Sequence, residues 1–120
     1  MKRYSNEHQW IECQGAEATV GITAFAAEEL GELNYVELPA IGAVIAANAP
    51  LCVVESVKAA SDVFLPVAGR VIAVNSRLEK EPGLINSSPE GEGWICRIDQ
   101  FSLSEVEALM DAAAYKAFTA

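Results

Sequence analysis

The sequence predicts a mainly β protein, a small sandwich or barrel with one short inserted helix and further helices at its C-terminus. Short segments in which apolar and polar residues alternate run through most of the chain, and Gly or Pro turn signals separate them. After residue 102 the apolar residues change to helical spacing. The length of 120 residues fits one domain, 1–120, with its β core expected over residues 17–99.

The chain is expected to open with a hairpin and a helix. A turn at Gln14-Gly15 separates an aromatic-rich stretch, residues 4–13, from the alternating segment 17–22. Thr23 stands where it can cap a short helix over residues 24–30. The first part of the chain thus predicts two paired strands followed by one short helix.

Short strands are expected to continue through the middle of the chain. Pro and Gly residues punctuate them, and the expected strands cover residues 33–38, 43–45, 51–55, 62–65, 70–74 and 94–98. Before the last of these strands, residues 79–92 are rich in Pro, Gly, Asn and Ser and predict an ordered surface loop. Trp94 is expected to lie in the core.

Two helices are expected near the C-terminus. Residues 102–105 read Ser-Leu-Ser-Glu and match a capping box, in which the first serine hydroxyl and the glutamate carboxylate each accept from a backbone N–H group. Val106, Leu109 and Met110 follow at helical spacing, and residues 112–118 predict a second short helix.

The charge balance narrows the possible partners. Eight Lys and Arg residues stand against 17 Asp and Glu residues, which gives a net charge of −9. Clustered cations that would bind phosphate are absent, which argues against nucleic acid and against an anionic membrane surface. No apolar run approaches the roughly 18 residues of a membrane helix, and no signal or transit peptide is visible, so a cytoplasmic protein is expected.

Few residues could carry chemistry of their own. His8 is the only histidine, and no nucleophile motif, phosphate-binding loop or metal-ligand spacing is present. Cys13, Cys52 and Cys96 are odd in number and form no CxxC pair, which indicates reduced thiols rather than a disulfide or a zinc site. An independent enzyme is therefore not expected.

Lys58 is the most informative residue of the chain. It is one of only four lysines, and it lies amid small residues between two strand-like apolar runs. If those runs pair, Lys58 occupies the exposed tip of a hairpin, with Glu55 and Asp62 on either side. The pattern alone favours an ordinary solvated turn lysine, and the sharper hypothesis is an acceptor for a covalently attached cofactor.

The segment Glu55-Ser56-Val57-Lys58-Ala59-Ala60-Ser61-Asp62 resembles the lipoyl attachment motif of the H protein of the glycine cleavage system. The resemblance extends over nearly the whole chain, in order and at matching spacing, through Tyr4, His8 and Trp10 and through residues 18–23, 30–31, 35–39, 66–69, 74–75, 81–86 and 91–94. It implies the lipoyl-domain type of fold, a flattened barrel or sandwich of two antiparallel sheets with the lysine on a hairpin.

The resemblance also implies a function. Lys58 would carry lipoate within an attachment motif to which Glu55, Ser56, Val57, Ala59 and Asp62 belong. The lipoyl arm would receive the aminomethyl group of glycine from the decarboxylase (P protein) and deliver it to the aminomethyltransferase (T protein). The dihydrolipoamide dehydrogenase (L protein) would reoxidise the arm, a lipoate-attaching enzyme would install it, and the carrier itself would be non-catalytic and monomeric.

One position departs from the family pattern. The family usually has His-Glu-Trp near its start, and this chain has His8-Gln9-Trp10. An amide binds an ammonium group less strongly than a carboxylate does. Glu7 would face the same way as Gln9 if the segment is extended, and so could compensate. A shelter for the loaded arm formed by Glu7, His8, Gln9 and Asp62 is therefore expected to be present but leakier.

Three alternatives stay open at this stage. An H-protein-like relay would donate lipoyl groups to other acceptors, and the residue Gln9 slightly favours it. A biotin carrier would use the same kind of hairpin, but Val57 and Ala59 stand where biotin acceptors usually present methionines. An unmodified interaction protein would carry Lys58 incidentally.

Overall fold

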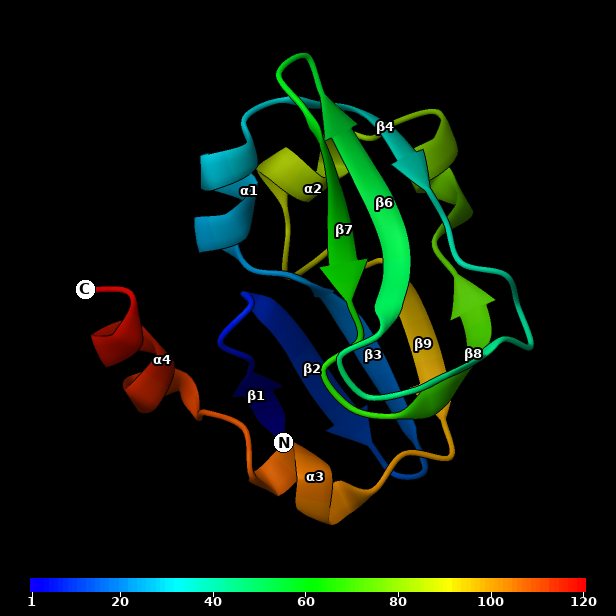
Figure 1. Ribbon diagram of the computed structural model, residues 1–120, viewed down its shortest axis with the longest axis vertical. Coiled ribbons are helices and arrows are strands. Elements are labelled where there is room, and N and C mark those ends of the chain that lie inside the picture. The colour runs from blue at the N-terminus through cyan, green and yellow to red at the C-terminus, as the bar shows by residue number, and fades with distance from the viewer.

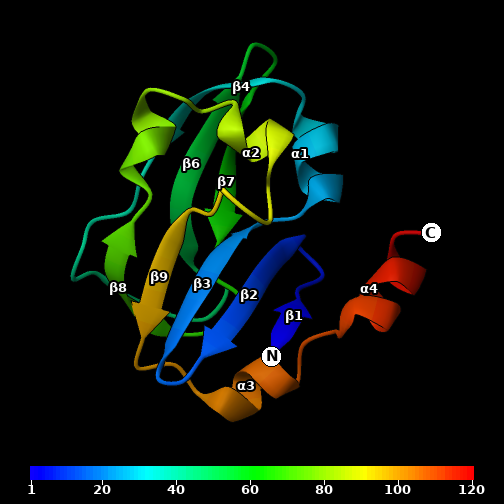
Figure 2. The same cartoon turned by 180° about the vertical axis from the view of Figure 1, so that it is seen from behind.

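Two antiparallel β-sheets pack face to face in the computed structural model, which describes all residues 1–120 (Figures 1 and 2). The larger sheet has the strand order β1-β2-β3-β9-β8-β5, and the smaller sheet has the order β4-β6-β7. No strand is shared between the sheets. The mainly β prediction is confirmed as a two-sheet sandwich, and the barrel alternative is not realised because the sheets do not close on each other.

The larger sheet contains β1 (Lys2–Tyr4), β2 (Gln9–Gln14), β3 (Glu17–Ile22), β9 (Cys96–Asp99), β8 (Gly69–Val74) and β5 (Val44–Ile45). The predicted hairpin joins β2 to β3, with Gln14 opposite Glu17 and Gly15 in the left-handed region at φ 63°. The indole of Trp10 lies so close to Gly21 that a Cβ there would be 2.8 Å from Trp10 Nε1. The strands β1 and β2 lie outside the range 17–99 that was expected for the β core.

The smaller sheet contains β4 (Leu33–Glu37), β6 (Pro50–Ser56) and β7 (Ala60–Phe64). Alternation along these strands sends one set of side chains into the sandwich and the other set to solvent. The shared core combines apolar side chains from both sheets, among them Ile11, Val20, Ile98, Val36, Val54 and Val63. Burial of this one cluster fixes which face of the hairpin β6–β7 turns toward the larger sheet.

The helix α1 (Ala24–Leu30) forms as predicted, and the Thr23 hydroxyl accepts from the Ala26 N–H group. The expected surface loop over residues 79–92 is only partly correct. It includes the helix α2 (Leu84–Ser87), and the 3-10 helix η1 (Ser76–Glu79) ends at its start. Trp94 is half-buried and precedes β9, so the prediction that it lies in the core is wrong.

The C-terminal segment forms α3 (Leu103–Glu107) and α4 (Ala112–Phe118). The capping box is wrong, because the Ser102 hydroxyl bonds to the Ser104 hydroxyl at 2.8 Å and makes no cap contact. Asp111 instead caps α4 by accepting from the Ala114 N–H group. Met110 was expected on a helix, and its backbone pairs with Tyr4 at the edge of β1.

The three cysteines are free thiols, as predicted, with Cys52 and Cys96 buried and Cys13 partly exposed. No group of His, Cys, Asp and Glu side chains is placed to hold a metal ion. None of the helices has the length and apolar character needed to cross a membrane.

Candidate functional site

The hairpin β6–β7 carries Lys58 at its tip, which projects beyond both sheets (Figure 1). Glu55 pairs with Ala60, and residues 57–59 form the connection between the strands. Both neighbours of Lys58 in this connection are exposed, and Val57 is 89% exposed. The predicted position of Lys58 on a hairpin tip is therefore where the structure places it.

Ser56 organises this tip. The Ser56 backbone N–H group donates to the Ala59 carbonyl at 3.0 Å, which closes the turn. The Ser56 hydroxyl accepts from the Lys58 N–H group at 3.3 Å and donates to the Ala59 carbonyl at 3.5 Å. These bonds fix the backbone of Lys58 and leave its side chain free to extend. No carboxylate lies within salt-bridge distance of the Lys58 amine.

The connection between α1 and β4 runs beside the Lys58 side chain. A Cβ at Gly31 would lie 3.8 Å from Lys58 Cε and 3.9 Å from Nζ, so this glycine borders the aliphatic stem. Asn86 on α2 holds the connection in place. Its side-chain amide donates to the Gly31 carbonyl at 2.8 Å and accepts from the Leu33 N–H group at 2.9 Å. The sequence reasoning assigned Asn86 no role, because a lone Asn in a loop-like stretch gives no such signal.

Three carboxylates share the outer face of the smaller sheet. Glu55 lies one pair from the tip, and Asp62 and Glu37 both lie opposite Val53 from the two neighbouring strands. Glu37 and Asp62 line one shallow hollow on this face. Asp62 is exposed and makes no hydrogen bond to any of the other residues expected in the shelter.

Gln9 is buried rather than presented to a cleft, with only 3% of its surface exposed. Its Oε1 accepts from the Ser5 hydroxyl at 2.5 Å, and its Nε2 donates to the Glu7 carbonyl at 3.1 Å. The segment before it is a turn, since the His8 N–H group donates to the Ser5 carbonyl. The premise that Glu7 and Gln9 lie on one face of an extended segment is therefore wrong.

The side chains of His8 and Glu7 contact different parts of the molecule. His8 has a φ of 68°, and its Nδ1 lies 2.8 Å from the Tyr115 hydroxyl of α4. Its ring also packs on Phe25 of α1, with the centroids 4.5 Å apart. Glu7 is exposed and lines a separate hollow of about 310 Å³ with Phe64 of β7. The four predicted shelter residues thus do not meet in one pocket here, and their role stays a prediction.

The hairpin tip exposes the amine of Lys58 and places no catalytic group beside it. The side-chain amine of Lys58 makes no hydrogen bond or salt bridge, because the one side-chain contact of this residue joins its backbone N–H group to the Ser56 hydroxyl. The surrounding residues are small or carry a negative charge. Such a tip is suited to covalent modification by another protein and to carrying the attached group.

Comparison with known proteins identifies the family. The family model for the glycine cleavage H-protein matches residues 2–120. The chain belongs to the glycine cleavage H-protein family. Two relatives named glycine cleavage system H protein come from Symbiobacterium thermophilum and Methylocella silvestris. The first is 48% identical over 98% of this chain and 91% of the relative, and the second is 52% identical over 97% and 93%.

A crystal structure of a glycine cleavage system H protein from Mycobacterium marinum superimposes with a TM-score of 0.86. It is 32% identical and covers 98% of this chain and 95% of that chain. H proteins are the lipoyl carriers of the glycine cleavage system and have no catalytic activity of their own, so this chain is a carrier subunit and not an enzyme. The fold and the family suggested by the sequence are confirmed.

Proposed function

We propose that this H protein carries its lipoyl group in amide linkage on Lys58. From there the arm takes the aminomethyl group of glycine from the decarboxylase (P protein) to the aminomethyltransferase (T protein). The observation that supports Lys58 is its exposed, unpaired side chain at the tip of β6–β7 in a chain of the H-protein family. The dihydrolipoamide dehydrogenase (L protein) is the proposed partner that reoxidises the arm.

The residues around Lys58 suit such an attachment. Exposed neighbours at the tip leave the amine open to an attaching enzyme, and Gly31 borders the aliphatic stem without crowding it. When bound, the lipoyl group supplies a disulfide that accepts the aminomethyl group. The hairpin supplies the tether, which raises the local concentration of the arm at each partner toward the millimolar range, on the order expected for short links.

The decisive experiment is an intact-mass measurement on protein made in a lipoylating host. We expect one lipoyl addition on the wild-type chain and none on Lys58→Arg, while Lys80→Arg serves as the matched control and keeps the addition. A biotinyl mass would support the biotin carrier instead. A wild-type chain without any addition would reject the carrier assignment of Lys58.

We propose that protection of the loaded arm depends on Asp62 and Glu7, because both carboxylates are exposed near β7, whereas the amide of Gln9 is already used inside its turn. His8 supports this region through its contacts with α1 and α4. Hydrolysis of the loaded intermediate should accelerate in Asp62→Asn and Glu7→Gln. An equal rate in Gln9→Glu and in the wild type would remove any role for position 9.

The burial of Gln9 favours a second candidate, a relay that passes lipoyl groups to other acceptors. A relay needs the attachment at Lys58 and does not need to bind an ammonium group. Incubation with glycine and the decarboxylase separates the two functions, since a pure relay would take up no aminomethyl group.

The remaining assignments follow from the same proposal. The chain, residues 1–120, acts as one domain and as a monomer. Its location is the cytoplasm, because three free cysteines are typical of proteins in a reducing compartment. A lipoate-attaching enzyme must act first, before any partner of the loaded arm.

A further inference from the structure

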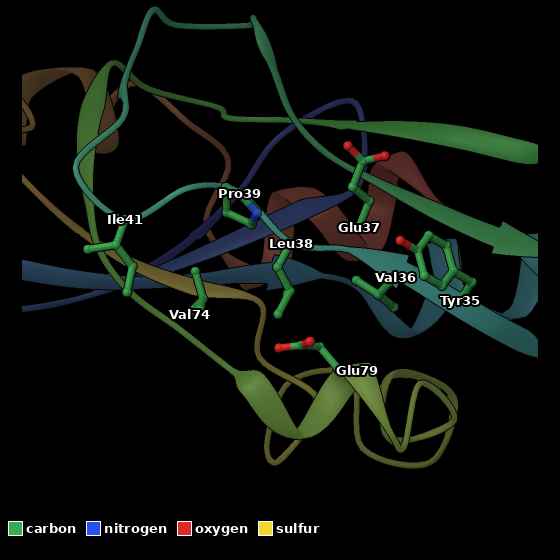
Figure 3. Close-up of a pocket in the computed structure, with 8 residues that line it drawn as sticks. All are labelled: Tyr35, Val36, Glu37, Leu38, Pro39, Ile41, Val74 and Glu79. Carbon is green, nitrogen blue, oxygen red and sulfur yellow. The ribbon is translucent and has the colours of Figure 1, made fainter.

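An apolar groove lies on the flank of the smaller sheet, beside the hairpin that carries Lys58 (Figure 3). It has a volume of about 570 Å³ and runs between β4, the segment that follows it, and the end of β8 with η1. Its lining residues are Tyr35, Val36, Glu37, Leu38, Pro39, Ile41, Val74 and Glu79. The function described so far makes no use of it.

The groove has an apolar floor and exposed apolar ends. Leu38 and Val74 face its interior, while Tyr35 lies at one end and Ile41 at the other (Figure 3). Tyr35 is 50% exposed and Ile41 is 66% exposed. Exposed apolar side chains that line a hollow together are typical of a protein contact surface.

The groove also carries unpaired negative charge. The carboxylate of Glu79 lies beneath Leu38, and Glu37 stands at the rim (Figure 3). Neither carboxylate takes part in a salt bridge, although four of the eight cationic side chains of the chain are paired elsewhere. A partner that fits this groove must bring apolar side chains together with at least one Lys or Arg.

The position of the groove beside the hairpin tip favours a partner that acts on the lysine amine itself. Tyr35 pairs with Glu55, which is three residues from Lys58, so the groove begins next to the hairpin tip. Partners of the loaded arm meet it at the end of a long flexible tether. The enzyme that installs the arm must instead bring its active site to the lysine amine itself, and so it must rest on the surface beside the tip.

A second copy of this chain fits the groove less well. With a net charge of −9, a copy would bring further carboxylates against Glu37 and Glu79. Like charges placed together at an interface are unfavourable.

We propose that this groove is the docking surface for the lipoate-attaching enzyme, which inserts an apolar segment flanked by basic side chains. The inference rests on the proposed attachment at Lys58. In the attachment step a bond forms between Nζ and the acyl carbon of an acyl adenylate made from lipoate and ATP. The bond from that carbon to the phosphate oxygen breaks and AMP leaves. Nζ attacks as the neutral amine, after its ammonium form has lost one proton, and releases a second proton as the amide forms.

The test compares attachment rates on the free apo-protein. The double variant Ile41→Ala with Glu79→Gln removes an apolar contact and a charge at exposed positions. The matched control, Leu103→Ala with Glu107→Gln, makes the same kinds of change at exposed positions on α3, at the other end of the molecule (Figure 1). With a purified lipoate ligase, lipoate and ATP, mass spectrometry gives KM and kcat for each protein.

We expect the groove variant to raise KM about tenfold, equivalent to about 1.4 kcal/mol, with kcat unchanged. Direct titration of apo-protein into the ligase should show the same loss of affinity. The control should stay within about twofold of the wild type, the size of effect expected for an exposed change outside an interface. Added salt should narrow the gap between the wild type and the groove variant, because salt screens the exposed charge that Glu79→Gln removes.

Other results would overturn the inference in distinct ways. Equal KM values for the wild type and the groove variant would show that the ligase does not use the groove. Unchanged attachment with slower reactions at the decarboxylase or the aminomethyltransferase would assign the groove to a later partner. A wild-type dimer that the variant converts to a monomer would assign it to self-association. A wild-type chain that is never modified would reject the proposed function as well.

Discussion

The two long hairpins of this protein have similar ladders but opposite uses. The hairpin β2–β3 lies inside a six-stranded sheet, and Gly15 closes it with a two-residue turn. The hairpin β6–β7 lies in a three-stranded sheet, and its three-residue tip extends into solvent with only Ser56 to order it. The first contributes buried residues to the scaffold, and the second presents a single side chain. With the tasks separated, residues at the tip make no contribution to the buried core, so changes there should not loosen it.

Truncation in the scaffold hairpin should have the largest effect. Ile11 of β2 is 0% exposed, so Ile11→Ala leaves a cavity and should lower the free energy of unfolding by about 2–5 kcal/mol. Val57→Ala at the tip should change it by less than about 0.5 kcal/mol. Urea unfolding of both variants measures the contrast. Similar losses in the two variants would contradict the division between scaffold and tip.

The free energy of unfolding should fall at alkaline pH, because two cysteines are buried in the core, one of them in the hairpin β6–β7. Burial raises the pKa of Cys52 in β6 and raises the pKa of Cys96 in β9 to about 12. Unfolding exposes both thiols, which then ionise nearer their ordinary pKa of about 8.5. Their stabilising contribution is therefore complete below about pH 8.5 and is lost as pH rises toward the folded-state pKa, by up to about 1.4 kcal/mol per pH unit for each thiol.

Urea titrations at pH 8 and pH 10 measure this loss, and the control is Cys52→Ala with Cys96→Ala, whose stability should depend less on pH over that range. A wild-type protein whose stability does not fall in this interval would mean that these thiols are not buried in solution.

Loss of Asn86 should affect the surroundings of the tip more than the tip itself. Asn86→Ala removes both hydrogen bonds to the connection between α1 and β4 and should cost about 2 kcal/mol, since it leaves polar groups at Gly31 and Leu33 unpaired. Lipoyl attachment at Lys58 should also slow, because this connection borders its stem. Ser87→Ala is the neighbouring control, and equal attachment rates in the two variants would exclude a positioning role for Asn86.

The smallest expected effect is at Ser56. Ser56→Ala should change the free energy of unfolding by less than about 0.5 kcal/mol, because both hydroxyl bonds are exposed. Amide hydrogen exchange at Lys58 should nevertheless become faster, and Ser56→Thr should restore protection. Unchanged exchange in Ser56→Ala would mean that the turn is ordered by its backbone bond alone.

Elements with a local signal were predictable from the sequence. Alternation and turn residues located the hairpin β2–β3, and Thr23 located the start of α1. For β6–β7 they indicated two strand-like runs around Lys58, and their pairing was implied by the family resemblance. The helix α2 was missed because its composition is typical of a loop and tertiary contacts maintain it. Gly93 packs against α2 so closely that a Cβ there would be 2.5 Å from the Leu84 carbonyl oxygen.

The same distinction holds for the site. The place of Lys58 on a hairpin tip was predicted on the condition that its two flanking strands pair, and the structure pairs them. Its role as the attachment site comes from the resemblance of the surrounding motif to the H-protein family and stays a prediction. The inward orientation of Gln9 depends on a turn with His8 at a positive φ, which nothing in the local sequence indicates. The groove beside β4 combines residues from three separate segments, so only the folded chain brings it together.

The pairing of Tyr4 with Met110 has a consequence for synthesis of the chain. The strand β1 forms one edge of the larger sheet, and its backbone bonds to Met110 while the ring of Tyr4 stacks on Tyr115 at 4.7 Å. Until the segment from Met110 to Tyr115 has left the ribosome, this edge of β1 has no cover, and uncovered sheet edges are sites of aberrant strand pairing. Chains truncated before this segment would therefore expose the unpaired edge of β1, and we expect them to aggregate more readily than the whole chain.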